Sequence, residues 1–400
     1  MKPVIILHHH EIILKGDNRG FFERQLLNNL RKVSSGIIPQ SAFSGGYGRF
    51  IVDINGISDT DLLVERLTKV FGIANVCSGL KVRQDVEEFC RGAGELLAGL
   101  EFKTIRVETK RADKNFPVRS MDVSARVGEY ICNRFNVRGN MSSPDETIYI
   151  SIVDGMAFVY LSKVQGAGGL PVGVSGRVVG LLSAGFDSPV ACWQLIKRGA
   201  NVIFVHFHSM PYTSQNSLDQ VRKLAEILAT YQMDSKLFLI PFAEVQQELI
   251  LKSPQPLRVI MYRRFMIRIA EEIARREKAE ALVTGESVGQ VASQTLRNIR
   301  AIDEAAVYPI LRPLSGMDKE ETLAIARKIG TFDISKEPYD DCCSYLAPRK
   351  PATWARLEEV TDAEAALDVS SLVGLALSNL TTEHYRYPAA HRTQLAETTA

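Results

Sequence analysis

The segment Ser183-Ala184-Gly185-Phe186-Asp187-Ser188 decides the fold of the C-terminal part of the chain. It follows the apolar run 178–182, which is typical of a strand buried on both faces, and precedes a predicted helix over 189–198. Ser188 is expected to cap this helix, with Pro189 at its first position. A turn of small residues entering a helix presents backbone N–H groups and a positive dipole end, which bind phosphate. The alternative is a tight strand-to-helix turn without a ligand.

The sequence around this turn predicts a doubly wound α/β domain over residues 177–400. Apolar runs alternate with amphipathic segments, as in a parallel sheet covered by helices on both faces. The further predicted strands cover 202–207, 237–241 and 281–284, and the further predicted helices cover 218–231 and 351–360. The Walker pattern (GxxxxGK followed by Ser or Thr) is absent, so the turn is not an ordinary P-loop.

Two smaller α/β units, over 1–56 and 57–164, are predicted before this domain, and the Gly-rich segment 165–176 is predicted to link them to it. Their predicted strands cover 4–14, 49–54, 76–82, 104–109 and a hairpin over 148–164, and their predicted helices cover 19–33, 62–70, 86–100 and 121–135.

Composition and charge exclude several classes of protein. The chain has 400 residues and a hydrophobic content of 46%, which suits packed cores and not a disordered chain. It has no apolar run of the roughly eighteen residues that a transmembrane helix needs, and its N-terminus does not read as a signal peptide. The net charge of +2 argues, by itself, against a surface coated in basic charge for nucleic acid.

The cysteines and histidines do not form a metal-binding pattern. The six cysteines include no CxxC pair, so reduced thiols and a cytoplasmic location are expected. Consecutive residues of a strand point to opposite faces, so His8, His9 and His10 cannot chelate one ion together. We therefore assign no metal to these side chains.

The turn at 183–188 resembles the PP-loop of ATP pyrophosphatases, whose usual form is SGGxDS. More specifically, the chain resembles the tRNA 4-thiouridine synthetases (tRNA uracil 4-sulfurtransferases) in ordered motifs that run from residue 14 to Cys343. These motifs include Leu14-Lys15-Gly16-Asp17-Asn18-Arg19, Lys110-Arg111-Ala112-Asp113-Lys114, Val205-His206-Phe207-His208, Thr284-Gly285-Glu286-Ser287, Gln290-Val291-Ala292-Ser293-Gln294-Thr295 and Gly316-Met317-Asp318-Lys319-Glu320-Glu321.

The resemblance implies ATP-dependent sulfur transfer to uridine 8 of tRNA. In this family the uridine O4 is adenylated with loss of pyrophosphate, and sulfur then displaces AMP at C4. The resemblance implies that Ser183, Gly185 and Ser188 hold the pyrophosphate end of ATP. Asp187 would be an essential carboxylate, acting through Mg²⁺ or by orienting the triphosphate, and Lys319 would neutralise developing charge. Without the resemblance, the sequence favours an exposed lysine at a helix start for Lys319.

The resemblance also implies contacts to the rest of the nucleotide. The residues implied are Leu181, Leu182, His206, Phe207, Arg263, Gly285 and Gln294. By themselves, Phe207 reads as a core residue and Arg263 as a surface cation. Ala184 departs from the family pattern, which has Gly there. An alanine at positive φ would cost roughly 1 kcal/mol, whereas in a right-handed conformation it is harmless, and we expect the latter.

The segment Asp340-Asp341-Cys342-Cys343 is the implied sulfur-handling site. Cys343 matches the family cysteine best and Cys342 is close behind, with buried inert thiols as the alternative. Some members carry a rhodanese domain with its own persulfide cysteine, and this sequence leaves no room for one. The expected sulfur source is therefore a partner, most simply a cysteine desulfurase, with a sulfur-carrier protein as a second implied partner. The family's link to thiamin thiazole synthesis is weaker for a chain without that domain.

The residues before the linker resemble a ferredoxin-like domain followed by a THUMP domain, which binds tRNA. Lys110, Arg111, Lys114 and Arg119 surround Phe116, and the resemblance implies that the cations meet phosphates while the ring packs on a ribose or base. The alternative is a solvated basic loop. The resemblance also implies a homodimer.

Two other functions stay open at this level. One is a different PP-loop enzyme, either another RNA thiolase or an adenylating ligase. The other is a tRNA-binding protein whose PP-loop has decayed, with Ala184 as the first sign. Retention of Asp187, Ser188, Lys319 and both adjacent cysteines favours the enzyme.

Overall fold

The computed structural model describes residues 1–46, 48–153, 155–340, 342, 348, 350–388 and 393–395. The chain divides into two compact units, Met1–Gly169 and Leu170–Ala400. Within the described residues, no helix has both the length and the hydropathy that a membrane crossing requires.

The first unit is built on a nine-stranded sheet within its described residues, with the order β2-β3-β1-β4-β8-β7-β5-β6 and β9 paired to β4. Its strands are β1 (Lys2–His8), β2 (Phe43–Gly46), β3 (Arg49–Asp53), β4 (Asn75–Val82), β5 (Thr104–Arg111), β6 (Arg138–Gly139), β7 (Glu146–Val153), β8 (Met156–Tyr160) and β9 (Val164–Gln165). Its helices are α1 (Arg19–Val33), α2 (Thr60–Thr68), α3 (Val86–Leu96) and α4 (Ser120–Phe135), with 3₁₀ helices η1 (Glu11–Asn18) and η2 (Gln40–Ala42).

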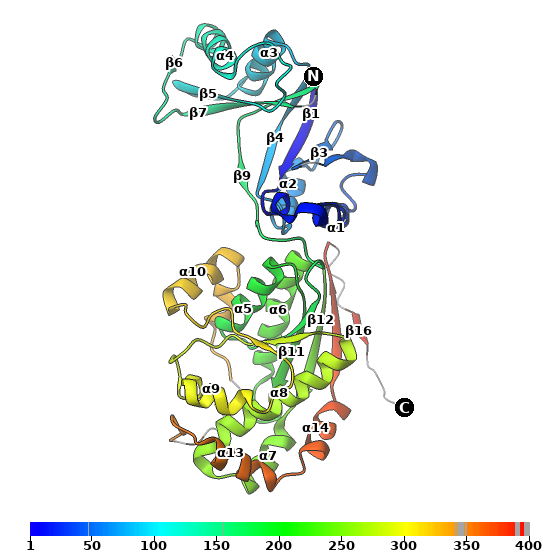
Figure 1. The fold of residues 1–400 in the computed structure, drawn as a ribbon, viewed down its shortest axis with the longest axis vertical. Coiled ribbons are helices and arrows are strands. Elements are labelled where there is room, and N and C mark those ends of the chain that lie inside the picture. The colour runs from blue at the N-terminus through cyan, green and yellow to red at the C-terminus, as the bar shows by residue number, and fades with distance from the viewer. Residues whose placement is uncertain are drawn as a thin grey trace. The chain divides into compact units, whose positions relative to one another are not determined.

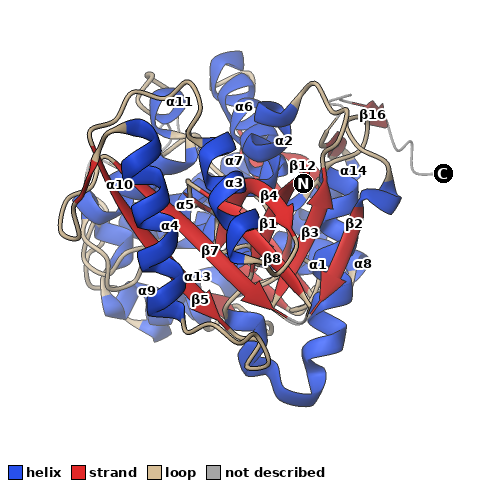
Figure 2. Cartoon of the chain, turned by 90° about the horizontal axis from the view of Figure 1, so that it is seen from above, coloured by secondary structure: helices blue, strands red, loops and turns tan. Residues whose placement is uncertain are grey.

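Helices α3 and α4 pack side by side on the sheet, α3 against β4 and β8 and α4 against β5 (Figure 2). Phe89 on α3 and Val123, Val127 and Ile131 on α4 are fully buried, so their apolar stripe forms the core with the strands.

The strand predicted over 4–14 is too long. Strand β1 ends at His8, and the chain from Glu11 onward forms η1 instead. Only Ile12 of its apolar residues is fully buried, whereas Ile13 and Leu14 are exposed. The apolar run therefore continues past the sheet into a turn, which apolar content alone does not distinguish from a strand.

The second unit contains the predicted parallel sheet, in the order β14-β13-β10-β11-β12-β15-β16 within the described residues. Its strands are β10 (Arg177–Leu181), β11 (Asn201–His208), β12 (Asp234–Pro241), β13 (Ala281–Val283), β14 (Ile310–Leu311), β15 (Thr381–Arg386) and β16 (Thr393–Leu395). The first five strands of that order pair in parallel, and β15 and β16 add antiparallel pairing at one edge.

Helices cover both faces of this sheet (Figure 1). Helices α5 (Asp187–Lys197) and α6 (Gln215–Gln232) pack on one face, with α10 (Lys319–Ile329) and α11 (Phe332–Ser335) against them. The other face is covered around α8 (Arg258–Glu277) by α7 (Ala243–Lys252), α9 (Leu296–Asp303), α13 (Leu357–Ala365) and α14 (Val369–Ser378), and short 3₁₀ helices lie at η3 (Gln255–Leu257) and η4 (Ala292–Gln294).

The topology places a switch point beside β10. The chain leaves β10 for β11 and β12 in one direction and returns to the other side of β10 for β13 and β14. In open α/β sheets, the carboxyl ends of strands at such a point form the ligand-binding crevice.

Two local predictions in this unit are wrong. Helix α5 begins at Asp187, so Ser188 lies inside the helix and does not cap it. The helix predicted over 351–360 begins only at Leu357, because residues 351–353 make backbone contacts with other segments: Ala352 N–H donates to Pro256 O, and Thr353 O accepts from Thr295.

Candidate active site

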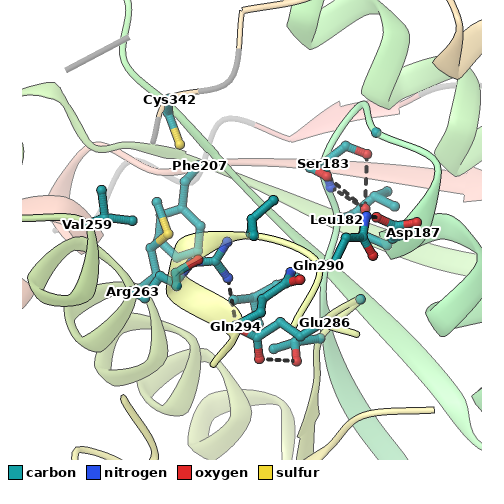
Figure 3. Close-up of a pocket in the computed structure, with 18 of the residues that line it drawn as sticks. Leu182, Ser183, Asp187, Phe207, Val259, Arg263, Glu286, Gln290, Gln294 and Cys342 are labelled. Atoms are coloured by element: carbon teal, nitrogen blue, oxygen red, sulfur yellow. Dashed lines mark hydrogen bonds and ion pairs between the residues drawn. The ribbon is translucent and has the colours of Figure 1, made fainter. Parts of the chain in front are cut away.

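A pocket of about 550 Å³ opens at the carboxyl ends of β10, β11 and β13 (Figure 3). Its volume lies in the usual range for small-molecule sites. The pocket gathers residues from segments that are far apart in the sequence: Leu181, Leu182, Ser183, Gly185, Asp187, Ser188, His206, Phe207, Arg263, Gly285, Gln294, Lys319 and Cys342. Every nucleotide-contact residue implied by the family resemblance therefore lines one cavity.

Ser188 holds the turn between β10 and α5 in shape. Its Oγ accepts a hydrogen bond from Ser183 N–H at 2.8 Å and lies 2.9 Å from Ser183 Oγ. Among the described residues, the non-glycine residues with positive φ are Asn136, Met233 and Lys278, so Ala184 adopts an ordinary conformation. The expectation that Ala184 does not adopt a positive φ is confirmed.

Two glycines allow close approach around this turn. A Cβ on Gly285 would lie 2.6 Å from Ser188 N, against the backbone at the start of α5. A Cβ on Gly185 would lie 2.8 Å from Tyr339 Oη. Both contacts are shorter than real Cβ atoms make, so the packing of β13 against the turn requires glycine at position 285.

Asp187 lies between two polar side chains from distant segments. Lys319 Nζ is 2.8 Å from Asp187 Oδ1, and Gln290 Nε2 donates to Asp187 Oδ2 at 3.0 Å. Lys319 is the first residue of α10, where the Asp318–Glu321 capping box fixes the helix start. The Lys319 side chain is 44% exposed, so its charge remains available at the pocket mouth.

A buried carboxylate, Glu286, orients Arg263. Arg263 Nη1 donates to Glu286 Oε1 at 2.8 Å, and Arg312 Nε donates to Glu286 Oε2 at 2.7 Å. Burial by itself would raise the pKa of Glu286, but the two guanidinium groups outweigh it and the pKa is lowered. Arg263 is therefore a fixed cation of the pocket wall and not a loose surface residue. Glu286 was not among the predicted site residues, although it lies in the quoted Thr284–Ser287 motif.

His206 is a buried, neutral imidazole in the pocket wall. Its Nδ1 lies 2.8 Å from Leu182 O, and because a carbonyl only accepts, Nδ1 carries the proton. Burial lowers the pKa of His206 to about 4, so the ring is neutral at pH 7. Its Nε2 is then a bare acceptor, and like Gln294 Oε1 it is buried with no hydrogen-bond partner among the described residues. Both atoms are suited to ligand N–H or O–H groups.

Phe207 is both a core residue and a residue of the pocket wall, so the two interpretations of this position are compatible. Its ring is 6% exposed and packs edge-on against Phe242 at 5.4 Å, so it belongs to the core. It also lines the pocket together with Val259 (Figure 3), and Met266 belongs to the same lining. This side of the pocket is apolar and lies away from Asp187, so it suits an aromatic base.

We predict that the buried His206 makes the second unit sensitive to acid. Between pH 6.5 and about 4 the unfolded chain binds a proton that the folded His206 does not. The free energy of unfolding should therefore fall by about 1 kcal/mol for each pH unit below 6.5 from this group. Urea unfolding at several pH values, followed by the tryptophan fluorescence of this unit, measures it. His206→Asn should flatten the slope, and an equal slope in both proteins would contradict the assignment.

Cys342 lies on the side of the pocket away from Asp187 (Figure 3). Its backbone carbonyl accepts a hydrogen bond of 2.8 Å from Gln246 Nε2, and both residues are buried. Asp340 accepts a hydrogen bond from Ser214 N–H at 3.1 Å, which ties the same segment to the end of the β11–α6 loop. Cys343 lies outside the described residues.

Two other cysteines, Cys77 and Cys192, are buried. Burial raises the pKa of each thiol to about 12, so these thiols are unreactive at neutral pH.

The basic loop of the first unit is partly a structural element. Lys110, Lys114 and Arg119 are exposed. Arg111, however, donates to Phe116 O at 2.7 Å and to Val118 O at 3.3 Å, and so closes the loop. Phe116 is 6% exposed and packs 5.8 Å from Phe89 in the core. The expectation that Phe116 packs on a ribose or base is not met in this structure, because its ring fills the core beneath the loop.

Models of known protein families match three consecutive parts of the chain. The ThiI ferredoxin-like domain matches residues 4–77, the THUMP domain matches 83–162, and the thiamine biosynthesis protein (ThiI) model matches 173–369. A protein named "Probable tRNA sulfurtransferase" from Thermoanaerobacter sp. (strain X514) is 41% identical over 374 residues, covering 93% of this chain and 97% of that protein. The chain belongs to the ThiI family of tRNA sulfurtransferases.

Membership of the ThiI family confirms the resemblance read from the motifs. A second relative of the same name, from Thermus thermophilus, is 39% identical over 394 residues, covering 95% of this chain and 93% of that protein. A solved structure described as a 4-thiouridine synthetase–RNA complex with bound ATP superposes with a TM-score of 0.86 at 34% identity, covering 96% of this chain and 100% of that one. The fold predicted from the sequence, with ferredoxin-like, THUMP and PP-loop domains, is confirmed.

Proposed function

We propose that this ThiI-family chain adenylates O4 of uridine 8 of tRNA with ATP and then replaces that oxygen with sulfur. The observation that carries the proposal is the convergence of a PP-loop turn, the Asp187–Lys319 pair and Cys342 on one pocket. Phosphate binding and sulfur chemistry thus have access to the same space. The solved family member with RNA and ATP supports the choice of substrates.

The phosphates of ATP are proposed to bind at the start of α5. Backbone N–H groups of the turn from Ser183 to Ser188 and the helix dipole favour negative charge there. Lys319 adds a compact cation that can follow the charge as pyrophosphate leaves. The adenosine part is assigned to the apolar side of the pocket, with contacts to Leu181, Leu182, His206, Phe207, Arg263, Gly285 and Gln294.

The donor set of the pocket fits a magnesium ion carried by the substrate phosphates. Within the described residues there is no cluster of three or more metal-ligating side chains. Mg²⁺ commonly binds through one carboxylate together with phosphate oxygens and water, and Asp187 offers that carboxylate. When bound, the ion would neutralise phosphate charge, and Asp187 would hold it.

The proposed reaction balances as two displacements. Uridine O4 attacks the α-phosphorus of ATP, and pyrophosphate leaves. The terminal sulfur of a persulfide then attacks C4, and AMP departs with the former O4. A second thiol breaks the S–S bond, and a thiol reductant must reopen the resulting disulfide. Cys342 or Cys343 is proposed to carry or resolve the persulfide.

The protein partners of the chain are also proposed from the family resemblance. A cysteine desulfurase, directly or through a sulfur-carrier protein, would supply the persulfide, and the thiamin thiazole is a second proposed destination of the sulfur. A homodimer is the assembly that the family resemblance implies.

Exposed lysines of the THUMP-like part are proposed to meet tRNA phosphates. We predict that Lys110→Ala with Lys114→Ala weakens tRNA binding and lowers the slope of log K against log salt by about 1 for each lost contact. Filter binding or anisotropy over a salt series measures the slope. Lys103→Ala, at the residue just before the opposite end of β5, is the matched control, because Lys103 is also exposed. Arg111 is left intact because its side chain holds the loop closed. An unchanged slope would mean that Lys110 and Lys114 do not contact the phosphates of tRNA.

The test of the proposed function is a reconstituted assay. The purified chain with ATP, unmodified tRNA and a persulfide donor should release AMP and pyrophosphate only when tRNA is present, and the digested tRNA should contain 4-thiouridine. Release of AMP without thiolated tRNA would favour another adenylating enzyme. Tight tRNA binding with no AMP would favour a tRNA-binding protein with an inactive PP-loop.

A further inference from the structure

An exposed tryptophan, Trp354, lies three residues after Pro351, which lines the active-site pocket. Trp354 is 66% exposed, whereas the other tryptophan of the chain, Trp193, is 4% exposed. The guanidinium carbon of Arg297 lies 4.0 Å from the centroid of the Trp354 ring. One face of the ring is thus covered by a cation, and the exposed area leaves the other face open to solvent. Tryptophan gains strongly from burial, and a ring with one face against a cation and the other face exposed can stack on a ligand.

The ring is joined to the pocket through two segments. Residues 291–297 contribute Val291 to the pocket lining, and residues 351–354 contribute Pro351. Val291 is 50% exposed and Leu296 is 69% exposed, so an apolar rim continues from the pocket lining onto the surface.

Hydrogen bonds fix these two segments to each other. Thr295 Oγ1 donates to Thr353 O at 2.9 Å, Asn298 Nδ2 donates to Ala352 O at 2.8 Å, and Ala355 N–H donates to Asn298 Oδ1 at 3.0 Å. Asn298 is 0% exposed. The backbone on both sides of Trp354 is therefore fixed relative to the pocket-lining segment, and Arg297 contacts the ring itself, as a binding platform requires.

The exposed arginines of α9 differ in their charge pairing from the cations in and beside the pocket. Arg263, Arg312 and Lys319 are each paired with a carboxylate. Arg297 and Arg300 on α9 are exposed, and no ion pair holds either of them among the described residues. The nearby carboxylates of α9 and its C-terminus, Asp303 and Glu304, are paired with Arg312 and Arg264. The surface beside Trp354 thus combines an aromatic face with uncompensated positive charge.

We propose that this surface, defined by Val291, Leu296, Arg297 and Trp354, binds the tRNA nucleotides that flank the target uridine. The inference rests on the proposed function, which requires a uridine base to enter the pocket from a folded RNA. Extruding that base unstacks its neighbours, and an aromatic ring backed by a guanidinium offers a replacement stacking partner. Arg297 and Arg300 supply charge for the adjoining phosphates. A nucleic acid fits this combination better than a protein partner does, because stacking and phosphate contacts are both provided.

Fluorescence provides a direct test that does not depend on catalysis. Trp354 is the exposed one of two tryptophans, so the difference between wild type and Trp354→Phe isolates its signal. Unmodified tRNA should quench this difference signal. It should also shield the Trp354 ring from further quenching by added acrylamide. A difference signal that tRNA leaves unchanged at saturation would overturn the proposal, even if the chain proves inactive in thiolation.

Kinetics provide the second arm. Trp354→Ala should lower kcat/KM for tRNA roughly tenfold or more, as expected for loss of one stacked base, while Trp354→Phe should stay within about threefold of wild type. The affinity for ATP in the absence of tRNA should not change in either variant. Leu251→Ala, which removes a side chain that is 78% exposed on α7 and does not line the pocket, is the matched control.

The outcomes separate this inference from the proposed function. Wild type that makes no 4-thiouridine would refute the function. Active wild type with an equally active Trp354→Ala would refute the inference alone. If Trp354→Ala slows the reaction with a protein persulfide donor but not with a small-molecule sulfide donor, the surface binds the donor protein and the proposal is wrong.

Discussion

Asp187→Asn is expected to lower AMP and pyrophosphate formation by about 100- to 1,000-fold while tRNA affinity stays unchanged. The carboxylate touches Lys319 and Gln290 at the entrance of the phosphate site, and the asparagine keeps its shape but removes its charge. Removing one group that stabilises charge developing in a transition state typically costs a factor of about 100 to 1,000 in rate. Tracking AMP release from labelled ATP in the presence of tRNA measures the effect.

The stability of this variant should hardly change. The Asp187 and Lys319 side chains are 23% and 44% exposed, and such ion pairs contribute only about 0–1 kcal/mol. Asp333→Asn is the matched control, because Asp333 forms a similar exposed pair with Lys336 at 2.7 Å outside the pocket lining. Full activity of Asp187→Asn would contradict the proposed role of Asp187 in adenylation. A large loss of stability would instead mean that the side chain serves mainly to hold the fold.

Cys342→Ser is expected to abolish 4-thiouridine formation while AMP release continues. The thiol faces the pocket, and a serine hydroxyl can neither carry nor resolve a persulfide. The assay therefore compares AMP with thiolated nucleoside in the same reaction.

Cys343→Ser tests the residue that the sequence favoured. If it alone stops thiolation while Cys342→Ser remains active, Cys343 handles the sulfur. Cys132→Ser, in the first unit, should behave as wild type. Normal thiolation in both Cys342→Ser and Cys343→Ser would exclude the pair from the reaction.

Much of the fold followed from local patterns in the sequence. The prediction of β10 over 178–182 differs from the observed Arg177–Leu181 by one residue at each end, and the helix predicted over 19–33 matches α1. These elements have strong periodicity and clear boundaries. The errors in strand and helix bounds fall where an apolar run leaves the sheet, as after His8, or where contacts to distant segments hold the chain, as at residues 351–353.

The candidate site was predicted as a set of residues but not as an arrangement. Motifs pointed to Asp187, Lys319, His206 and Cys342 separately. No local signal showed that Glu286 holds Arg263, or that Phe116 turns into the core. Such facts depend on the packing of segments that are far apart in the sequence.

The sequence by itself determined the elements, the family and the chemical type of each site residue, because periodicity, turn residues and side-chain chemistry are local properties. Only the tertiary structure decided which groups meet, which charges are paired and which rings stay exposed. The physical reason is that burial and pairing are set by neighbours in space: Lys319 reaches Asp187 across 132 positions of sequence, and Trp354 stays in solvent where Trp193 does not.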